Sequence, residues 1–207
     1  MKQRLKSLIN RAVFLETTSV GLMFTFFGKI SVGQVMSMIA IVLSISWTIA
    51  AIKYGDRDWR KYYPSMLFAG LGNALYEILC YNYQLWQMEP NGLGFSIIPM
   101  LLLILIGMPL STWVFLSKYP YNSGIFKKGL YVLIFILLFI ALEFVSVKLG
   151  AISYHRGWHL GWSLLFVTVM FMVIRVHYSR PILALILSIP FTLFLCMIFE
   201  VTLDKMK

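Results

Sequence analysis

The sequence predicts an all-α integral membrane protein, a bundle of seven transmembrane helices with a six-helix core at residues 35–203. Hydrophobic residues make up 60% of the 207 residues, charged residues 13%, and the mean hydropathy is +0.82. A soluble domain of this composition would expose far more apolar surface than it could bury. Several apolar runs also approach the roughly 20 residues that a helical crossing needs. They lack the alternation of apolar and polar residues found in membrane barrels, so we expect helices.

Six crossings form the predicted core. The most strongly apolar runs are Met100–Met108 and Tyr131–Ile140. The connections between runs are short, and none has the composition of a disordered linker or of a second domain. We therefore expect a six-helix transmembrane domain over residues 35–207, with helices at 35–53, 64–81, 95–117, 129–149, 160–176 and 181–203.

Residues 1–34 hold a basic N-terminal segment and the first expected helix, 12–32. Glu16 precedes the apolar run Leu22–Phe27. An interfacial helix and the apolar region of a signal peptide are the alternatives. A signal peptide fits the basic start of the chain, but no Ala-x-Ala-like cleavage site follows, and Glu16 interrupts the apolar run.

The distribution of basic residues favours a crossing at 12–32 and predicts the orientation. With seven crossings, thirteen Lys and Arg residues fall on one side of the membrane and five on the other. Without the first crossing, nine fall on each side. Cytoplasmic loops carry the excess of Lys and Arg. We therefore expect a multi-pass protein of the cell membrane with its N-terminus in the cytoplasm and its C-terminus outside.

The net charge of +10 is carried mostly by short loops beside apolar helices. Anionic lipid headgroups at the cytoplasmic face are therefore the expected partners. A membrane protein partner stays open, whereas nucleic acid is not expected because no binding motif is present. Cys80 and Cys196 lie in or at the end of apolar helices, and the sequence neither requires nor excludes a bridge between them.

Polar residues within the crossings mark the candidate site, because ionisable groups in a bilayer are costly and usually face the bundle interior or a cavity. Three carboxylates qualify, and all belong to the outer half of the membrane in the expected orientation: Glu77, Glu143 and Glu200. The spacing of Asn73, Glu77 and Tyr81 places them on one helix face. The outer loop between the fifth and sixth helices adds polar and aromatic groups at Tyr154, His155, Arg156, Trp158 and His159.

Two interpretations of these groups stay open. A buried carboxyl group has a raised pKa, so Glu143 with His155 or His159 could relay protons or act in catalysis. Alternatively, the carboxylates pair with Lys148 or Arg156 and fix the helix register.

A metal site is the weaker reading of the two histidines. Their i, i+4 spacing would place both rings on one side of a helix, where a carboxylate could complete a zinc site. Gly157 lies between them and indicates a loop, and no HExxH-type signature is present. No metal or cofactor is therefore expected.

No complete catalytic constellation is visible, since the sequence has no glycine-rich phosphate loop, HExxH or GxSxG motif. We therefore expect a non-enzymatic accessory or structural component of the cell or spore membrane. One alternative is a membrane-embedded enzyme acting on a lipid or isoprenoid through Glu143 and Glu77, which should show a groove opening laterally near Glu143. The other is a proton-coupled small-solute transporter, which should show a midplane cavity and broken helices. Candidate breaks are Gly107–Pro109 and Ser188–Pro190.

The loops also carry a family resemblance. Its residues are Gly55–Trp59, Lys61–Pro64, Tyr81–Trp86, Leu149–Tyr154 and Gly157–Trp158, with Glu143, His177, Tyr178 and Pro181. On these residues the chain resembles, over about 53–203, an uncharacterised family of small multi-pass membrane proteins of spore-forming Gram-positive bacteria. The resemblance implies a membrane fold and a Gram-positive source, but no activity. A shorter likeness, at Glu143, Gly150 and Tyr154, is to membrane enzymes that act on carotenoids, and it supports the enzymatic alternative.

Overall fold

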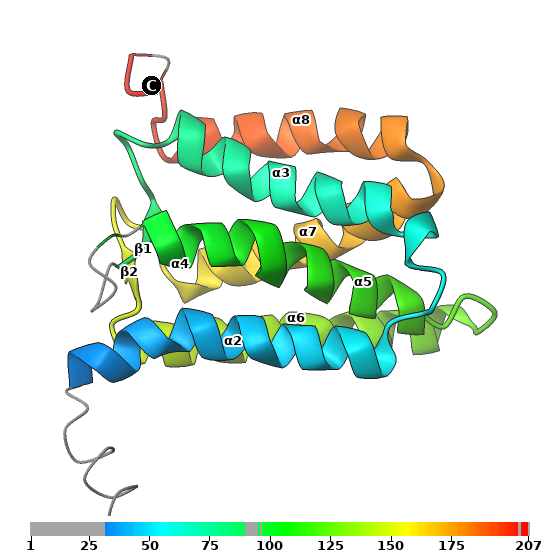
Figure 1. Ribbon diagram of the computed structural model, residues 1–207. Coiled ribbons are helices and arrows are strands. Elements are labelled where there is room, and N and C mark those ends of the chain that lie inside the picture. The colour runs from blue at the N-terminus through cyan, green and yellow to red at the C-terminus, as the bar shows by residue number, and fades with distance from the viewer. Residues whose placement is uncertain (1–31, 90–94, 96, 203, 207) are drawn as a thin grey trace, which may run out of the picture. The chain divides into compact units, whose positions relative to one another are not determined.

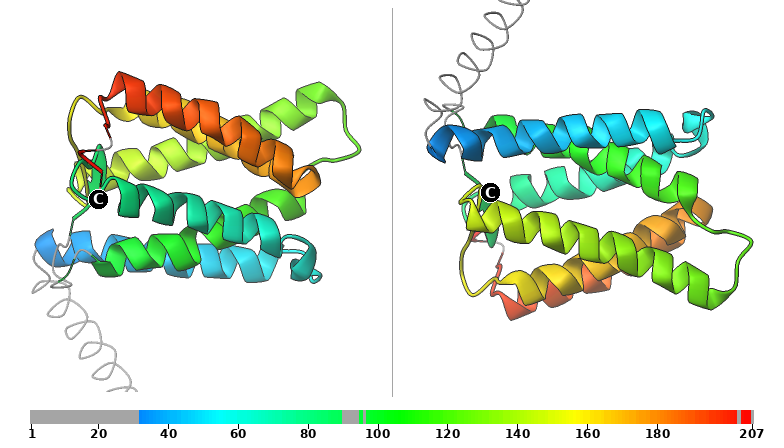
Figure 2. Two further views of the ribbon diagram at one scale, coloured as in Figure 1. Left: turned by 90° about the horizontal axis from the view of Figure 1, so that it is seen from above. Right: turned by 90° about the horizontal axis from the view of Figure 1, so that it is seen from below.

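The computed structural model describes residues 32–89, 95, 97–202 and 204–206. The chain divides into Met1–Val35 and Met36–Lys207, and the features below belong to the second unit. Long helices follow one another there in antiparallel order (Figures 1 and 2). The predicted all-α membrane bundle is confirmed at this level, but the described residues hold six long helices, not seven. The expected first helix, 12–32, lies outside them except for its last residue.

The elements follow the expected order of crossings. The six long helices are α2 (Val32–Tyr54), α3 (Tyr63–Leu79), a rod made of α4, η2 and α5, α6 (Ile125–Lys148), α7 (Leu160–Ser179) and α8 (Pro181–Ile198). Within the rod, α4 (Ile97–Leu102) and α5 (Met108–Lys118) flank a π-helical segment, η2 (Leu103–Gly107). The short elements are the 3-10 turn η1 (Trp59–Lys61) and the strands β1 (Trp86–Met88) and β2 (Ile152–Tyr154).

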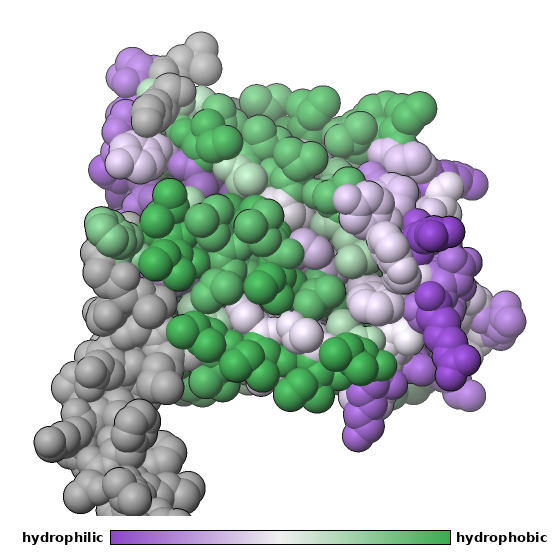
Figure 3. Space-filling model, viewed as in Figure 1, coloured by the Kyte–Doolittle hydropathy of each residue, from purple (hydrophilic) through white to green (hydrophobic). Residues whose placement is uncertain are grey.

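Four of the described helices are long and apolar enough to cross a membrane, namely the α4–α5 rod, α6, α7 and α8. Large hydrophobic side chains are exposed along them, and Ile182 and Met197 of α8 are among the most exposed. On the face drawn in Figure 3, apolar side chains form a band, and polar residues gather at the right-hand end and at the upper left. Such a band is favourable against lipid and unfavourable against water. The structure therefore indicates a membrane location.

The two polar ends of the bundle differ in charge. One, the basic end, holds the turn after α2, the α5–α6 loop and the α7–α8 turn (Figure 1). Its cations are Lys53, Arg57, Arg60, Lys61, Lys118, Lys127, Lys128, Arg175 and Arg180. The other, the cap end, holds β1, β2 and the end of α8; its described cations are Lys148, Arg156 and Lys205.

The core lies where α3, α5, α6 and α7 meet. Phe115 of α5 is 0% exposed and its ring packs against Phe135 of α6 and Phe171 of α7, with centroids 5.1 and 4.8 Å away. Helix α3 approaches the rod closely because Gly70 has no side chain: a Cβ there would lie 2.9 Å from the carbonyl oxygen of Ile104. This close packing fixes the half of the bundle nearest the basic end.

The rod departs from α-helical geometry where the sequence predicts a break. Pro109 has no N–H, and its ring conflicts with the carbonyl four residues earlier in a regular helix. The chain widens just before it, and the Met108 N–H bonds to Leu103 O across the π-helical segment. Single π-turns of this kind are frequent at functional sites. Helix α8, in contrast, stays helical through Pro190.

Replacing Phe115 by alanine should reduce the free energy of unfolding by about 3–5 kcal/mol, because the cavity left behind is surrounded by aromatic rings. The matched control is Phe126→Ala at the basic end, where the ring is 81% exposed; its effect should stay within about 0.5 kcal/mol. Denaturation in detergent, followed by circular dichroism, measures both. Equal losses in the two variants would contradict this description of the core.

Candidate functional site

Two loops that are distant in sequence meet at the cap end as a small antiparallel sheet. β1 and β2 pair Trp86 with Tyr154 and Met88 with Ile152. The sheet therefore joins the loop after α3 to the loop after α6, and it brings Tyr154 over the end of the bundle.

A helix-ending turn sets the position of β2. After α6, Gly150 adopts a φ of 71°, in the left-handed region where glycine is unstrained. The Ala151 N–H then bonds to Ser146 O at 2.8 Å, and the Gly150 N–H bonds to Val147 O, as in a Schellman motif. The turn reverses the chain, so that Tyr154 of β2 comes within hydrogen-bonding distance of Glu143 in the preceding helix, α6.

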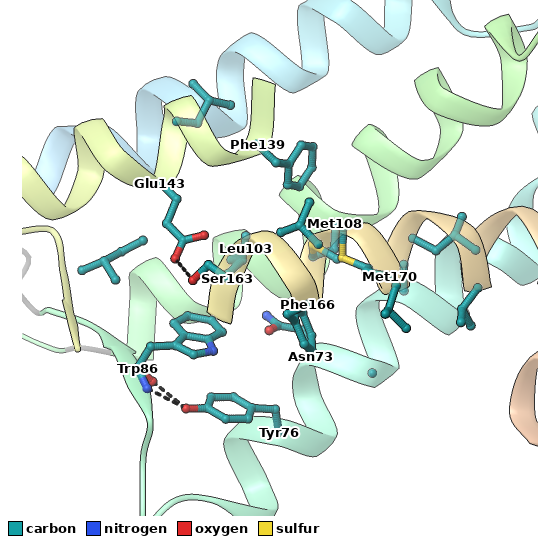
Figure 4. Close-up of a pocket in the computed structure, with 18 of the residues that line it drawn as sticks. Asn73, Tyr76, Trp86, Leu103, Met108, Phe139, Glu143, Ser163, Phe166 and Met170 are labelled. Carbon is teal, nitrogen blue, oxygen red and sulfur yellow. Dashed lines mark hydrogen bonds between the residues drawn. The ribbon is translucent and has the colours of Figure 1, made fainter. Parts of the chain in front are cut away.

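Tyr76 of α3 holds β1 in place. Its hydroxyl accepts hydrogen bonds from the N–H groups of Leu85 and Trp86, both at 2.9 Å, and donates to Trp86 O at 2.8 Å. The rings of Tyr76 and Trp86 also stack, with centroids 5.0 Å apart (Figure 4). One side chain from within the bundle thereby fixes both the backbone and the ring of the capping strand.

Glu143 lies at the centre of a hydroxyl network that links α6, α7 and β2. Its Oε1 accepts a hydrogen bond from Tyr154 at 2.6 Å and another from Ser163 of α7. The Trp158 ring N–H in turn donates to Ser163 Oγ at 2.9 Å. Burial raises the pKa of Tyr154, and its bond to Glu143 raises it further, so its hydroxyl stays protonated as a donor.

The network borders a cavity of about 310 Å³ inside the bundle. This volume falls at the lower end of the range for small-molecule sites. The lining is mostly apolar and comes from all six long helices and from the cap (Figure 4). Glu143 is its sole charged side chain among the described residues, and eight of the lining residues are aromatic: Trp47, Phe68, Tyr76, Trp86, Phe139, Trp158, Phe166 and Phe191.

The cavity reaches the apolar outer surface between α3 and α8. Gly72 of α3 and Thr192 of α8 both line the cavity and are both exposed. A Cβ added at Gly72 would meet no atom within 4 Å, so the wall there is open. A ligand could thus have one end beside Glu143 and the other in lipid.

Glu77 does not join Glu143. It is 7% exposed and accepts a long hydrogen bond, 3.4 Å, from Gln84. It does not line the cavity. Nearby, Cys80 and Cys196 pack in one cluster and are both free thiols. The buried Glu77 and the partly buried Glu143 therefore have separate partners.

The predicted shared face of Asn73, Glu77 and Tyr81 is only partly realised. Asn73 lines the cavity, and its buried Nδ2 has no hydrogen-bond partner within the described part of the chain. Helix α3 ends at Leu79, so Tyr81 lies beyond the helix and is 61% exposed. Glu200 likewise lies beyond its helix, since α8 ends at Ile198 and not at 203; it is exposed in a turn with a φ of 52°.

His155 and Arg156 belong to the outer side of the cap. His155 contacts Ser153 Oγ at 3.0 Å, and Ser153 donates to Glu89 at 2.5 Å. This bond holds the pKa of Glu89 below its usual value, with smaller contributions from Gln87 and His155. The Arg156 guanidinium lies over a tyrosine ring rather than beside a carboxylate.

His159 caps helix α7: its Nδ1 accepts the Gly161 N–H at 3.1 Å. His155 therefore follows β2 and His159 precedes α7 in the same loop, and neither hydrogen-bonds to Glu143 in the described structure. Within the described residues, no three His, Cys, Asp or Glu side chains gather to hold a metal. Of the predicted site residues, Glu143, Asn73 and Trp158 line the cavity together, with Tyr154 bonded to Glu143.

The sequence reasoning missed Tyr76 and Ser163. Ser163 belongs to the buried stripe of α7 with Val167, Phe171 and Ile174. A hydroxyl on an apolar stripe, one crossing away from a carboxylate within a helix, was an available signal. The role of Tyr76 had no comparable signal, because it depends on where the loop after α3 returns.

Comparison of the chain with family models, with curated proteins and with solved structures found no match.

Tyr76→Phe should loosen the cap while leaving the bundle folded, because it leaves the N–H groups of Leu85 and Trp86 without their acceptor. Amide hydrogen exchange at these two positions should accelerate by about tenfold, the equivalent of one lost hydrogen bond. Tyr63→Phe is the matched control, since Tyr63 is half-exposed at the basic end. Unchanged exchange in Tyr76→Phe would show that the strand does not depend on this hydroxyl.

Proposed function

We propose that this integral membrane protein binds a lipid-like small molecule within the bundle, with the polar end of the ligand at Glu143. The observation that carries the proposal is the cavity itself: it is apolar, it ends at one hydrogen-bonded carboxylate, and its mouth faces lipid. Binding sites for small molecules combine these features, an apolar wall with a few placed polar groups.

The proposal keeps the non-enzymatic role expected from the sequence and makes it more specific. An accessory protein of the cell or spore membrane would hold, present or sequester its ligand. The resemblance to membrane proteins of spore-forming Gram-positive bacteria is the support for that setting. The network supplies hydroxyl donors to Glu143, but in the described residues no imidazole or second carboxylate completes an acid–base pair.

An enzyme acting on a lipid or isoprenoid is the second candidate, and one specific observation favours it. The cavity opens laterally between α3 and α8 and has Glu143 at its inner end, so a lipid substrate could reach the carboxylate from the membrane. General acid catalysis by Glu143 would need its carboxyl proton to reach the bound substrate, and general base catalysis would need a substrate proton to reach its carboxylate. Mass spectrometry of the extracted ligand separates the two candidates, because an enzyme yields a substrate and product pair.

A transporter has weaker support. The π-helical segment at Leu103–Gly107 interrupts the rod beside the cavity. The other candidate break, at Pro190, leaves α8 helical. Solute uptake into proteoliposomes driven by a proton gradient would test this function.

We further propose that the basic end faces the cytoplasm and that residues 12–32 cross the membrane. Nine described cations lie at the basic end and three at the cap end, and cytoplasmic loops carry such an excess. Anionic headgroups are then the partners of the basic end.

This orientation predicts which introduced cysteines react with a membrane-impermeant maleimide in intact cells. The variants are made in protein whose native Cys80 and Cys196 have been replaced. Asp204→Cys at the cap end should be labelled from outside, and Ser123→Cys at the basic end should not. Lys2→Cys should be protected like Ser123→Cys if residues 12–32 cross. Labelling of Ser123→Cys from outside would reverse the orientation. Labelling of Lys2→Cys from outside while Ser123→Cys stays protected would remove the first crossing.

The binding function predicts a loss of ligand in Gly72→Trp, because the indole would fill the mouth of the cavity. A clash of about 1–3 kcal/mol lowers the affinity for the ligand by roughly 5- to 150-fold. Gly129→Trp is the matched control: Gly129 is also helical and exposed with no atom within 4 Å of an added Cβ, but it does not line the cavity. Lipid extracted from the two purified proteins is compared by mass spectrometry. The proposal fails if both carry the same small molecules in the same amounts.

A further inference from the structure

Glu143 has a free oxygen that faces the cavity. Its Oε1 accepts both hydroxyl donors, Tyr154 and Ser163, whereas no group of the described chain hydrogen-bonds to Oε2. Figure 4 shows that this second oxygen points away from Ser163 into the space between the helices. Half of the hydrogen-bonding capacity of the carboxylate is therefore open to a ligand.

No basic side chain of the described residues neutralises this carboxylate. The two expected partners point elsewhere: Lys148 Nζ lies over the Phe144 ring, and the Arg156 guanidinium lies 3.5 Å from the centroid of the Tyr83 ring. The sole ion pair of the described residues, between Lys61 and Asp56, is at the basic end. A carboxylate beside hydrocarbon is costly without a positive partner.

The surroundings of Glu143 suit a positive charge. No Lys, Arg or His of the described residues lines the cavity, so none would repel it. Aromatic rings line its walls, including Trp86 and Trp158 at the cap and Trp47 and Phe139 deeper in the bundle. A carboxylate combined with aromatic faces is the environment in which proteins bind ammonium groups.

We propose that the ligand of this cavity is a lipophilic amine, whose protonated nitrogen pairs with Glu143 and whose apolar chain leaves between α3 and α8. This inference rests on the binding function proposed above. The ammonium supplies the missing counter-charge and donates to Oε2, and the open wall at Gly72 accommodates a chain longer than the cavity.

The same ammonium chemistry occurs in a free long-chain amine and in the amino headgroup of a phospholipid. The structure favours the free amine. A phospholipid would bring a phosphate close to Glu143, and the described lining offers no cation to hold that phosphate.

The test uses two probes of equal chain length, n-dodecylamine and n-dodecanol, with full-length protein in phosphatidylcholine nanodiscs. Empty nanodiscs give the background from partition into lipid. Wild-type protein should bind dodecylamine more tightly than dodecanol. Glu143→Gln keeps the shape of the side chain but removes its charge, and it should weaken dodecylamine binding about tenfold or more, as expected for a charge-assisted bond. Dodecanol should change by less than about threefold, because an amide oxygen still accepts a hydroxyl.

Glu143→Asp guards against an effect of misfolding, since it keeps the charge and should keep the preference for the amine. Equal binding of both probes, or unchanged amine binding in Glu143→Gln, would overturn the amine assignment. Gly72→Trp should weaken both probes whatever the headgroup. If it does so while Glu143→Gln does not, the amine inference fails but the binding function stands; if Gly72→Trp weakens neither probe, the binding function itself fails.

Competition identifies the source of the ammonium. Nanodiscs that contain phosphatidylethanolamine should not displace dodecylamine. Displacement would instead assign the site to the phospholipid headgroup and overturn the free amine.

Discussion

A polar atom that enters the hydrocarbon core must bring its hydrogen-bond partner with it, because lipid offers none. Hydroxyl side chains in the bundle meet this constraint within their own helix: Ser44, Ser146 and Ser188 each donate to the carbonyl four residues earlier. Glu143 cannot do so, since a carboxylate accepts and its own helix has no free N–H groups at this position. Its donors come from another helix and from a strand of the cap. This carboxylate thus ties together three elements, α6, α7 and β2.

The same constraint explains why the helices were predictable and some of their ends were not. Apolar runs must become helices in lipid, so the core crossings follow from composition and length. The end of α8 depends instead on a local turn, in which Glu200 adopts a left-handed conformation and the Val201 N–H bonds to Cys196 O. That conformation is uncommon for a residue other than glycine, so the helix predicted from the sequence ends later, at 203, than α8 does.

The part of the site that was predictable from the sequence is the residue whose placement in a membrane carries a large energetic cost. Glu143 stands out because a carboxylate within a crossing needs a reason to be there. Its partners do not stand out, because they depend on the return of two loops and on which neighbour covers each helix face. Asn73 and Glu77 differ by about 40° around α3, which is enough for one to line the cavity and the other to turn towards Gln84. The loop histidines were predicted as part of the site from proximity in sequence alone, and the turn at Gly150 and the sheet carry them to the outer surface of the cap.

The pairing of β1 with β2 also has a consequence for biosynthesis. Glu89 and Ser153 are 64 residues apart, and the α4–α5 rod and α6 lie between them. At translation rates of about 5–20 residues per second, the first strand waits roughly 3–13 s for its partner to be made. Both intervening helices are synthesised during that interval, and α7 and α8 are synthesised later still. The nascent chain therefore passes through a stage in which β1 has no strand partner and the cavity has no complete wall, so the binding function proposed above requires the finished protein and not the chain on the ribosome.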